Sequence, residues 1–200
     1  MVTPQAFAAQ FPFALDPFQR QAVDAVDAGM SVLVAAPTGS GKTVVAEYAI
    51  DRALGRRGKA FYTTPLKALS NQKFGDLTAK LGADRVGLLT GDNTINSEAP
   101  VVVMTTEVLR NMLYERSDTL QGLESVVMDE VHYLQDPYRG AVWEEVLIHL
   151  ATSVGVVCLS ATISNAEEFG EWIRTLRGET RVIIEETRPV PLEHHYLIGH

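Results

Sequence analysis

Cysteine is almost absent from this chain of 200 residues: Cys158 is the single one, so no disulfide bond can form within the chain. Such usage is typical of a reducing compartment, and we expect a cytoplasmic protein. No run of about 18 consecutive apolar residues occurs, so we expect no membrane-spanning helix and no membrane partner. The first fifteen residues lack the basic start and continuous apolar core of a secretory signal, so none is expected.

Basic residues are too few for general electrostatic binding of nucleic acid. The chain has 17 Lys and Arg against 25 Asp and Glu, which gives a formal net charge of −8. Any contact with nucleic acid must therefore be local rather than spread over a basic surface. Hydrophobic residues make up 46% of the chain and charged residues 21%, which indicates a folded globular protein and not a disordered one.

Short apolar runs rich in β-branched residues alternate with helical patterns along the chain. Some runs are unbroken, such as Val101-Val102-Val103-Met104, and this is typical of strands covered on both faces. We expect strands at 31–35, 60–64, 86–89, 101–105, 125–129, 154–160 and 181–185. Helices are expected at 17–29, 43–55, 66–81, 107–116 and 164–178. The alternation predicts an α/β fold, a three-layer, doubly wound and mostly parallel sheet.

A glycine-rich segment stands between the first expected strand and the next helix, as a phosphate-binding loop requires. Glycines there allow backbone N–H groups to turn inward onto phosphate oxygens, and the helix N-terminus adds a partial positive charge. Lys42 is expected to reach the β- and γ-phosphates, and the Thr43 hydroxyl to bind Mg²⁺. The alternative is a turn that merely joins strand to helix. The expected nucleotide-binding residues are Pro37, Thr38, Gly39, Ser40, Gly41, Lys42 and Thr43, preceded by Ala36 where the general pattern has glycine.

Two acids follow the apolar run Val126-Val127-Met128. Carboxylates at the end of a buried strand are costly unless a cation or solvent accommodates them. In enzymes with a phosphate-binding loop, an acid at this place helps to hold Mg²⁺ and a second group orients the attacking water. We assign Asp129 to the metal and Glu130 to the water. The alternative for Asp129 is an ordinary helix cap.

The string Asp129-Glu130-Val131-His132 resembles motif II of the DExH-box group of superfamily 2 helicases. Further strings resemble other helicase motifs in family order: 63–69 motif Ia, 90–92 and 105–107 the region of motif Ib, and 160–162 motif III. Strings at 13–19, 69–73, 90–96 and 139–145 narrow the resemblance to the superkiller-type, exosome-associated RNA helicases. The loop 37–41 is most similar to their bacterial and chloroplast branch. This resemblance runs from about residue 11 to 192.

The resemblance implies a RecA-like P-loop NTPase domain that uses ATP and Mg²⁺, with Lys42, Asp129, Glu130 and His132 as catalytic residues. It implies that Gln19 reads the adenine edge while Phe13 stacks on the base. Gln19 is also expected at the third position of a capping box begun by Asp16, so two roles compete for its side chain. The alternative for Phe13 is a hydrophobic staple or core contact, and that for His132 a passive histidine.

Motif III residues Ser160 and Thr162 are implied to couple the nucleotide site to domain closure. Their alternative is a turn that caps the helix after Ser164, where Ser164 and Glu167 form a second capping box. The resemblance also implies contacts with the phosphate backbone of single-stranded RNA, through hydroxyls and backbone N–H groups. Helix capping by the threonines is the alternative. The candidates are Thr64, Pro65, Lys67, Thr90, Gly91, Thr105 and Thr106.

The expected organisation is an N-terminal segment with the adenine-reading motif (1–29), a RecA-like ATP-binding domain (30–186) and the start of a connection (187–200) to an absent second RecA-like domain. We expect this first motor domain alone to bind ATP weakly and hydrolyse it very slowly, because a second domain supplies arginine fingers in the family. Two alternatives remain. One is a superfamily 2 DNA helicase or translocase, and the other is a nucleotide-dependent binding module without productive hydrolysis.

Overall fold

The computed structural model describes residues 2–131, 140–161 and 165–187. Within them, eight strands form one sheet in the order β4-β3-β5-β2-β6-β7-β1-β8. The strands are β1 (Ser31–Ala35), β2 (Lys59–Thr64), β3 (Val86–Leu89), β4 (Thr94–Ile95), β5 (Val101–Thr105), β6 (Leu123–Met128), β7 (Gly155–Ser160) and β8 (Thr180–Ile184). The helices are α1 (Pro4–Ala8), α2 (Pro17–Asp27), α3 (Thr43–Gly55), α4 (Lys67–Leu81), α5 (Thr106–Glu115), α6 (Gly140–His149) and α7 (Ala166–Arg177).

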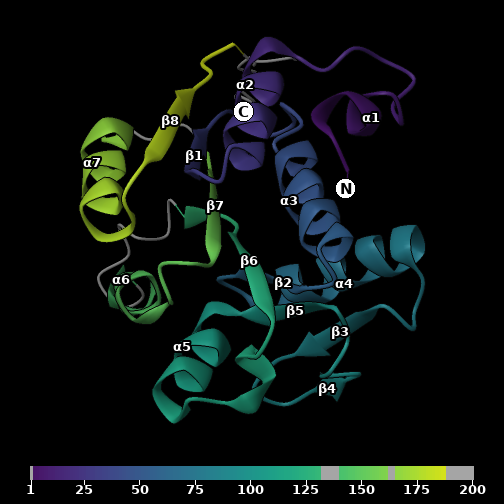
Figure 1. The fold of residues 1–200 in the computed structure, drawn as a ribbon. Helices are drawn as coiled ribbons and strands as arrows, with labels where there is room; N and C mark the ends of the chain where they lie inside the picture. The colour runs from purple at the N-terminus through teal and green to yellow at the C-terminus, as the bar shows by residue number, and fades with distance from the viewer. Residues whose placement is uncertain (1, 132–139, 162–164, 188–200) are drawn as a thin grey trace, which may run out of the picture.

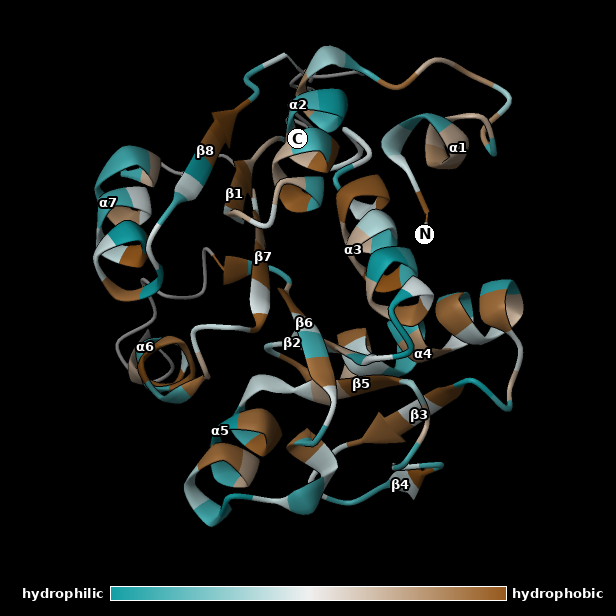
Figure 2. Ribbon diagram, in the orientation of Figure 1, coloured by the Kyte–Doolittle hydropathy of each residue, from teal (hydrophilic) through white to brown (hydrophobic). Residues whose placement is uncertain are grey.

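Helices cover both faces of the sheet, as the unbroken apolar strands predict (Figure 1). One buried cluster joins the sheet to α2, α3 and α4 through residues such as Ala22 and Tyr48. A second cluster on the opposite face joins it to α5, α6 and α7 through Leu109, Trp143 and Ile173. Figure 2 shows the same division, with mostly brown strands inside and helices that turn teal residues outward. The expected three-layer α/β fold is confirmed.

The pairing of strands is parallel throughout, apart from the antiparallel contact between β3 and β4. The carboxyl ends of β1, β2, β5, β6 and β7 therefore meet at one edge of the sheet, where ligands bind in open α/β folds. β1 lies between β7 and β8, and β2 lies between β5 and β6. Only β7 separates β1 from β6, and all three strands are parallel, so the loop after β1 and the acids after β6 lie at the same edge, one strand apart.

The expected strands all form within one or two residues, but some elements were missed. β4 is a two-residue exposed strand at the sheet edge, too short to show an alternating pattern. The five-residue α1 is likewise too short for a periodic stripe. α6 was missed because its apolar residues, which include Val142, Trp143, Val146 and Leu147, follow each other too closely to mark a single face. α7 begins at Ala166 with Asn165 at its N-cap, and Ser164 lies outside the described residues.

Cys158 is buried completely in β7, and burial raises the pKa of its thiol to about 12. A thiol that stays protonated is a poor nucleophile. We therefore expect the native chain to react negligibly with a thiol reagent such as DTNB, and the chain unfolded in guanidinium to react at one thiol per chain. Prompt reaction of the native chain at neutral pH would contradict this burial.

In the described part of the chain, no helix combines the length and apolar character needed to span a membrane.

Candidate nucleotide site

The loop between β1 and α3 has the backbone shape of a phosphate cradle. Gly39 and Gly41 have φ of +82° and +83°, values that favour glycine. A Cβ on Gly41 would lie 2.5 Å from Nε2 of Gln19, so a side chain there would also have to displace the Gln19 amide. The loop leads into the N-terminus of α3, whose first residue is Thr43. Backbone N–H groups at such a terminus favour an anion.

Lys42 is held inside this loop by the loop's own backbone. Its Nζ donates to the carbonyl oxygens of Ala36 at 2.5 Å and Pro37 at 3.1 Å. Burial lowers the pKa of the Lys42 ammonium, whereas the negative charges of Glu130 and Asp129 act to raise it. The two acids are therefore close enough to influence the cation of the loop.

Gln19 uses both ends of its amide. Its Oε1 accepts a hydrogen bond from the Asp16 backbone N–H at 2.9 Å, as a capping box requires. Its Nε2 donates to the carbonyl oxygen of Gly41 at 3.1 Å and approaches that of Ser40 at 3.4 Å. The side chain is buried and joins the start of α2 to the loop. The capping role expected for Gln19 is present, and adenine reading stays a prediction.

Asp129 and Glu130 follow β6 directly. The Asp129 backbone N–H donates to the Thr63 carbonyl at 2.9 Å, and its Oδ1 accepts the backbone N–H of Glu130 at 2.9 Å. Its Oδ2 accepts a hydrogen bond from the Tyr62 hydroxyl at 2.5 Å. Glu130 has φ of +58°, an uncommon conformation for a residue with a side chain that recurs at functional sites.

A cavity of about 520 Å³ joins the loop to the two acids. Its volume lies in the range of small-molecule sites. The cavity combines a cationic loop with two carboxylates, which suits a phosphate group and a divalent cation together. The lining residues are Thr38, Gly39, Gly41, Lys42, Thr43, Thr64, Leu69, Gln72, Lys73, Asp129, Glu130 and Leu159.

The oxygen atoms around this cavity fit Mg²⁺. The hydroxyl-bearing Thr43 and the carboxylate-bearing Asp129 both line it, and Mg²⁺ prefers oxygen ligands together with substrate phosphates. Ser40 belongs to the same loop but does not line this cavity, and its buried Oγ has no hydrogen-bond partner among the described residues. An orphaned hydroxyl beside the cradle is available to a ligand.

Sequence reasoning missed Tyr62, whose hydroxyl contacts Asp129, and four residues that line the cavity: Leu69, Gln72, Lys73 and Leu159. Leu69, Gln72 and Lys73 stand at positions i, i+3 and i+4 of α4, so they share one helical face. That spacing was visible in the sequence and could have placed them at the strand edge. Tyr62 gave a weaker signal, since a tyrosine inside an apolar strand needs a hydrogen-bond partner. Burial first, and the Asp129 charge second, raise the pKa of Tyr62 well above its usual value.

The other four expected site residues differ in their surroundings: one is exposed, one is buried, and two lie outside the described residues. Phe13 is exposed and its ring lies 5.4 Å from that of Phe11, centroid to centroid. Ser160 ends β7, is fully buried, and has an Oγ without a hydrogen-bond partner in the described part of the structure. His132 and Thr162 lie outside the described residues. The roles assigned to these four residues remain predictions.

The candidates for nucleic-acid contact gather at the carboxyl ends of three neighbouring strands, β2, β5 and β3. Their hydroxyls tie these strand ends together: Thr64 Oγ1 donates to Leu66 O at 3.0 Å, and Thr106 Oγ1 to Thr64 O at 3.3 Å. Thr90 donates to Asp92 at 3.0 Å. Thr64, Pro65, Thr90, Thr105 and Thr106 are buried, whereas Lys67 and Gly91 are exposed. Lys67 pairs with Asp92 at 2.9 Å.

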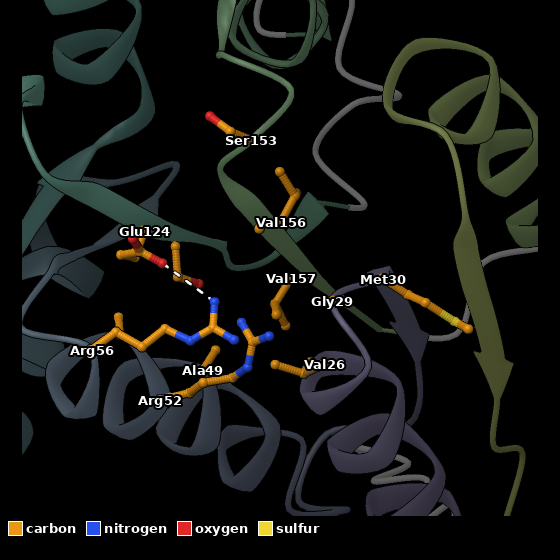
Figure 3. Close-up of a pocket in the computed structure, with 13 residues that line it drawn as sticks. Val26, Gly29, Met30, Ala49, Arg52, Arg56, Glu124, Ser153, Val156 and Val157 are labelled. Carbon is orange, nitrogen blue, oxygen red and sulfur yellow. Dashed lines mark ion pairs between the residues drawn. The ribbon is translucent and has the colours of Figure 1, made fainter. Parts of the chain in front are cut away.

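A second cavity lies at the opposite edge of the sheet, near the amino ends of β6 and β7 (Figure 3). Its volume of about 90 Å³ is too small for a nucleotide. Two guanidinium groups extend into it, but Arg56 pairs with Glu124 at 3.6 Å and Arg52 donates to the Asp27 carbonyl at 3.2 Å. The cavity beside the glycine loop, which is lined by the loop and both acids, is the candidate nucleotide site.

Comparison with known proteins agrees with this geometry. The family model described as DEAD/DEAH box helicase matches residues 16–169, which include the loop, both acids and Ser160. The chain belongs to the DEAD/DEAH box helicase family. This helicase domain is 62% identical over 193 residues to the probable helicase HelY of Mycobacterium leprae, covering 96% of this chain and 21% of HelY. It is 52% identical to human Superkiller complex protein 2, covering 95% of this chain and 15% of that protein.

A solved structure supports the fold of this helicase domain. The structure of Mycobacterium smegmatis helicase Lhr bound to ssDNA and AMP-PNP superposes with a TM-score of 0.71 at 30% identity, covering 91% of this chain and 27% of Lhr. This helicase domain spans about a fifth of the length of HelY. The expected similarity to superkiller-type helicases and their bacterial relatives is confirmed.

Proposed function

We propose that this helicase domain is the first motor domain of an ATP-dependent RNA helicase that binds Mg²⁺–ATP in the cavity beside the glycine loop. The observation that carries the proposal is the meeting of Lys42 with Asp129 and Glu130 across one cavity. Together with a second RecA-like domain of a longer chain, the domain would couple ATP hydrolysis to unwinding or translocation. The unit boundaries 1–29, 30–186 and 187–200 are part of this proposal.

The loop and the two acids that line the cavity have separate roles in this reaction. The loop backbone and Lys42 bind the β- and γ-phosphates, and Lys42 leaves the carbonyls of Ala36 and Pro37 to do so. Thr43 and Asp129 hold Mg²⁺, which when bound neutralises charge on the phosphate oxygens. Glu130 would orient a water molecule and accept its proton as the water attacks the γ-phosphorus, while the bond from the γ-phosphorus to the β–γ bridging oxygen breaks and ADP leaves. His132 is proposed as a further catalytic residue next to these acids in the sequence.

Recognition of the base and coupling to the partner domain use residues around this centre. We assign the Gln19 carboxamide to the adenine edge and Phe13 to stacking on the base; the hydrogen bond from Gln19 to the Gly41 carbonyl supports a link between Gln19 and the nucleotide loop. Ser160 presents a buried hydroxyl at the end of β7 that has no partner among the described residues, and with Thr162 it would report the state of the nucleotide to the second domain.

The nucleic-acid face is the edge formed by the carboxyl ends of β2, β5 and β3. Here α4 begins at Lys67 and α5 begins at Thr106, so two helix N-termini offer backbone N–H groups at one edge. Such groups bind phosphates without many cations, which suits a chain of net charge −8. RNA is favoured by the similarity to two relatives named as RNA helicases, the chloroplastic DExH-box ATP-dependent RNA helicase DExH15 of Arabidopsis thaliana (48% identical) and the Exosome RNA helicase MTR4 of Mus musculus (49% identical). We also propose a cytoplasmic location, because the single cysteine is free and such cysteine usage is typical of a reducing compartment.

Competition between short single-stranded RNA and DNA of one sequence tests this face. We expect this domain to bind RNA several-fold more tightly at matched salt, because a 2′-hydroxyl adds contacts that DNA lacks. Lys67→Ala should weaken binding and reduce the slope of log affinity against log salt by about 1. Arg85→Ala removes an exposed cation at the other end of β3 and serves as the matched control.

Two results would redirect the proposal. Tighter binding of DNA would favour the DNA helicase alternative, to which the structure of Lhr bound to ssDNA also points. Equal losses in Lys67→Ala and Arg85→Ala would show that the carboxyl edge of β2 is not the nucleic-acid face.

A further inference from the structure

Tyr62 is a buried residue of β2 whose hydroxyl meets the carboxylate assigned to the metal. Its side chain is 1% exposed, and its hydroxyl donates to Asp129 Oδ2 at 2.5 Å. The other carboxylate oxygen, Oδ1, accepts the Glu130 backbone N–H at 2.9 Å. Each oxygen of Asp129 thus has a protein donor, so the orientation of the carboxylate is defined on both sides.

The sheet register explains why Tyr62 is the residue that reaches Asp129. Tyr62 lies opposite Val127 in the parallel pairing of β2 with β6. Side chains two residues apart on one strand share a face, so Val127 and Asp129 point to the same side of the sheet. Tyr62 belongs to the buried cluster on that side, together with Val127 and Val45 of α3. A tyrosine is long enough to extend from one register position to the carboxylate just beyond the strand end.

We infer that Tyr62 is a positioning residue that fixes the orientation of the Asp129 carboxylate before nucleotide and Mg²⁺ bind. This inference rests on the proposed function of Asp129. A carboxylate held by a hydrogen bond loses less rotational freedom when it takes up a ligand, and partners behind metal-binding residues raise metal affinity in the same way. The ring of Tyr62 has a separate contact, since Lys73 Nζ lies 5.4 Å from its centroid.

Tyr62→Phe isolates the hydroxyl, because phenylalanine keeps the ring and therefore the contact with Lys73. The probe is a fluorescent ADP analogue whose binding to the chain is titrated with Mg²⁺ and compared with binding in EDTA. We expect the Mg²⁺ concentration for half-maximal binding to rise on the order of tenfold. Affinity in EDTA should stay within about twofold, because the loop and Lys42 are unchanged.

Tyr48→Phe is the matched control. Tyr48 is also buried, and its hydroxyl donates to a carboxylate, that of Asp27, at 2.6 Å. This pair lies between α3 and the end of α2, and neither residue lines the nucleotide cavity. Loss of either hydroxyl should lower the thermal midpoint of unfolding. Tyr62→Phe alone should shift the Mg²⁺ titration, which a merely structural role would leave unmoved.

A cycle with Asp129→Asn separates action through Asp129 from a general effect on the fold. If Tyr62 acts through the carboxylate, adding Tyr62→Phe to Asp129→Asn should produce no further change in the Mg²⁺ titration. Additive shifts, or an unchanged titration in Tyr62→Phe, would overturn the inference and leave the proposed function standing. Nucleotide binding by the unmodified chain that ignores Mg²⁺ would instead overturn the proposed function of Asp129. Should Tyr62→Phe not fold, Tyr62→Leu takes its place: a shifted Mg²⁺ titration that disappears in the Asp129→Asn background would support the inference, and an unchanged titration would overturn it.

Discussion

Replacing Glu130 with glutamine is expected to lower the rate of ATP hydrolysis by about 10²- to 10⁴-fold, the size of a general-base contribution. Glutamine has almost the same shape but does not accept a proton, so water attack slows while binding persists. Nucleotide affinity should stay within about twofold, since the loop and Lys42 are untouched. Single-turnover release of labelled phosphate, with protein in excess over ATP, resolves slow rates on this chain.

Glu144→Gln provides the control for Glu130→Gln, because Glu144 is an exposed acid of α6 outside the cavity. It removes the same charge and should leave hydrolysis unchanged. Equal hydrolysis rates in Glu130→Gln and the unmodified chain would rule out the role of Glu130 as base. That result would favour the alternative of a binding module without productive hydrolysis.

Lys42→Ala is expected to weaken nucleotide binding by about 10- to 100-fold. A hydrogen bond to a charged group contributes about 1.5–3 kcal/mol, and each 1.4 kcal/mol corresponds to a tenfold change in affinity. The loss should be larger for ATP than for ADP, because Lys42 is assigned to both the β- and γ-phosphates. Equilibrium titration with fluorescent analogues of both nucleotides measures this difference.

The Lys42→Ala result needs a check on folding, because Lys42 also donates to the carbonyls of Ala36 and Pro37. Thermal unfolding measures any loss of stability, and Arg85→Ala serves as a charge-matched control remote from the cavity. A folded Lys42→Ala variant with unchanged affinity for both nucleotides would remove the assignment of this loop as a phosphate-binding loop.

The strands and the edge that carries the site could be predicted because both depend on local patterns. Unbroken apolar runs such as Val126-Val127-Met128 identify strands buried on both faces, and parallel strands place their carboxyl ends together. The meeting of Lys42 with Asp129 followed from these two facts. The order of strands in the sheet could not be predicted in this way, because the position of β1 between β7 and β8 depends on pairing between segments that are distant in the sequence.

Side-chain contacts at the site were harder to predict than its location. The hydroxyls of Thr64, Thr90 and Thr106 suit phosphate contacts by residue type, yet in the structure they bind groups within the domain. Only the tertiary arrangement of three strand ends decides between these roles. The contact of Tyr62 with Asp129 was hidden for the same reason, since the two residues are 67 positions apart.

The amide of Gln19 has a consequence for how a base would enter. One end of this amide holds the first turn of α2, and the other end holds the carbonyl of Gly41. A purine that recruits the amide must take it from partners it already has, so capture of the base is an exchange of hydrogen bonds and not a simple gain. Selectivity for one purine over another would then depend on whether the new hydrogen bonds to that base are as strong as the two that the Gln19 amide gives up. The start of α2 would change with the base that is bound.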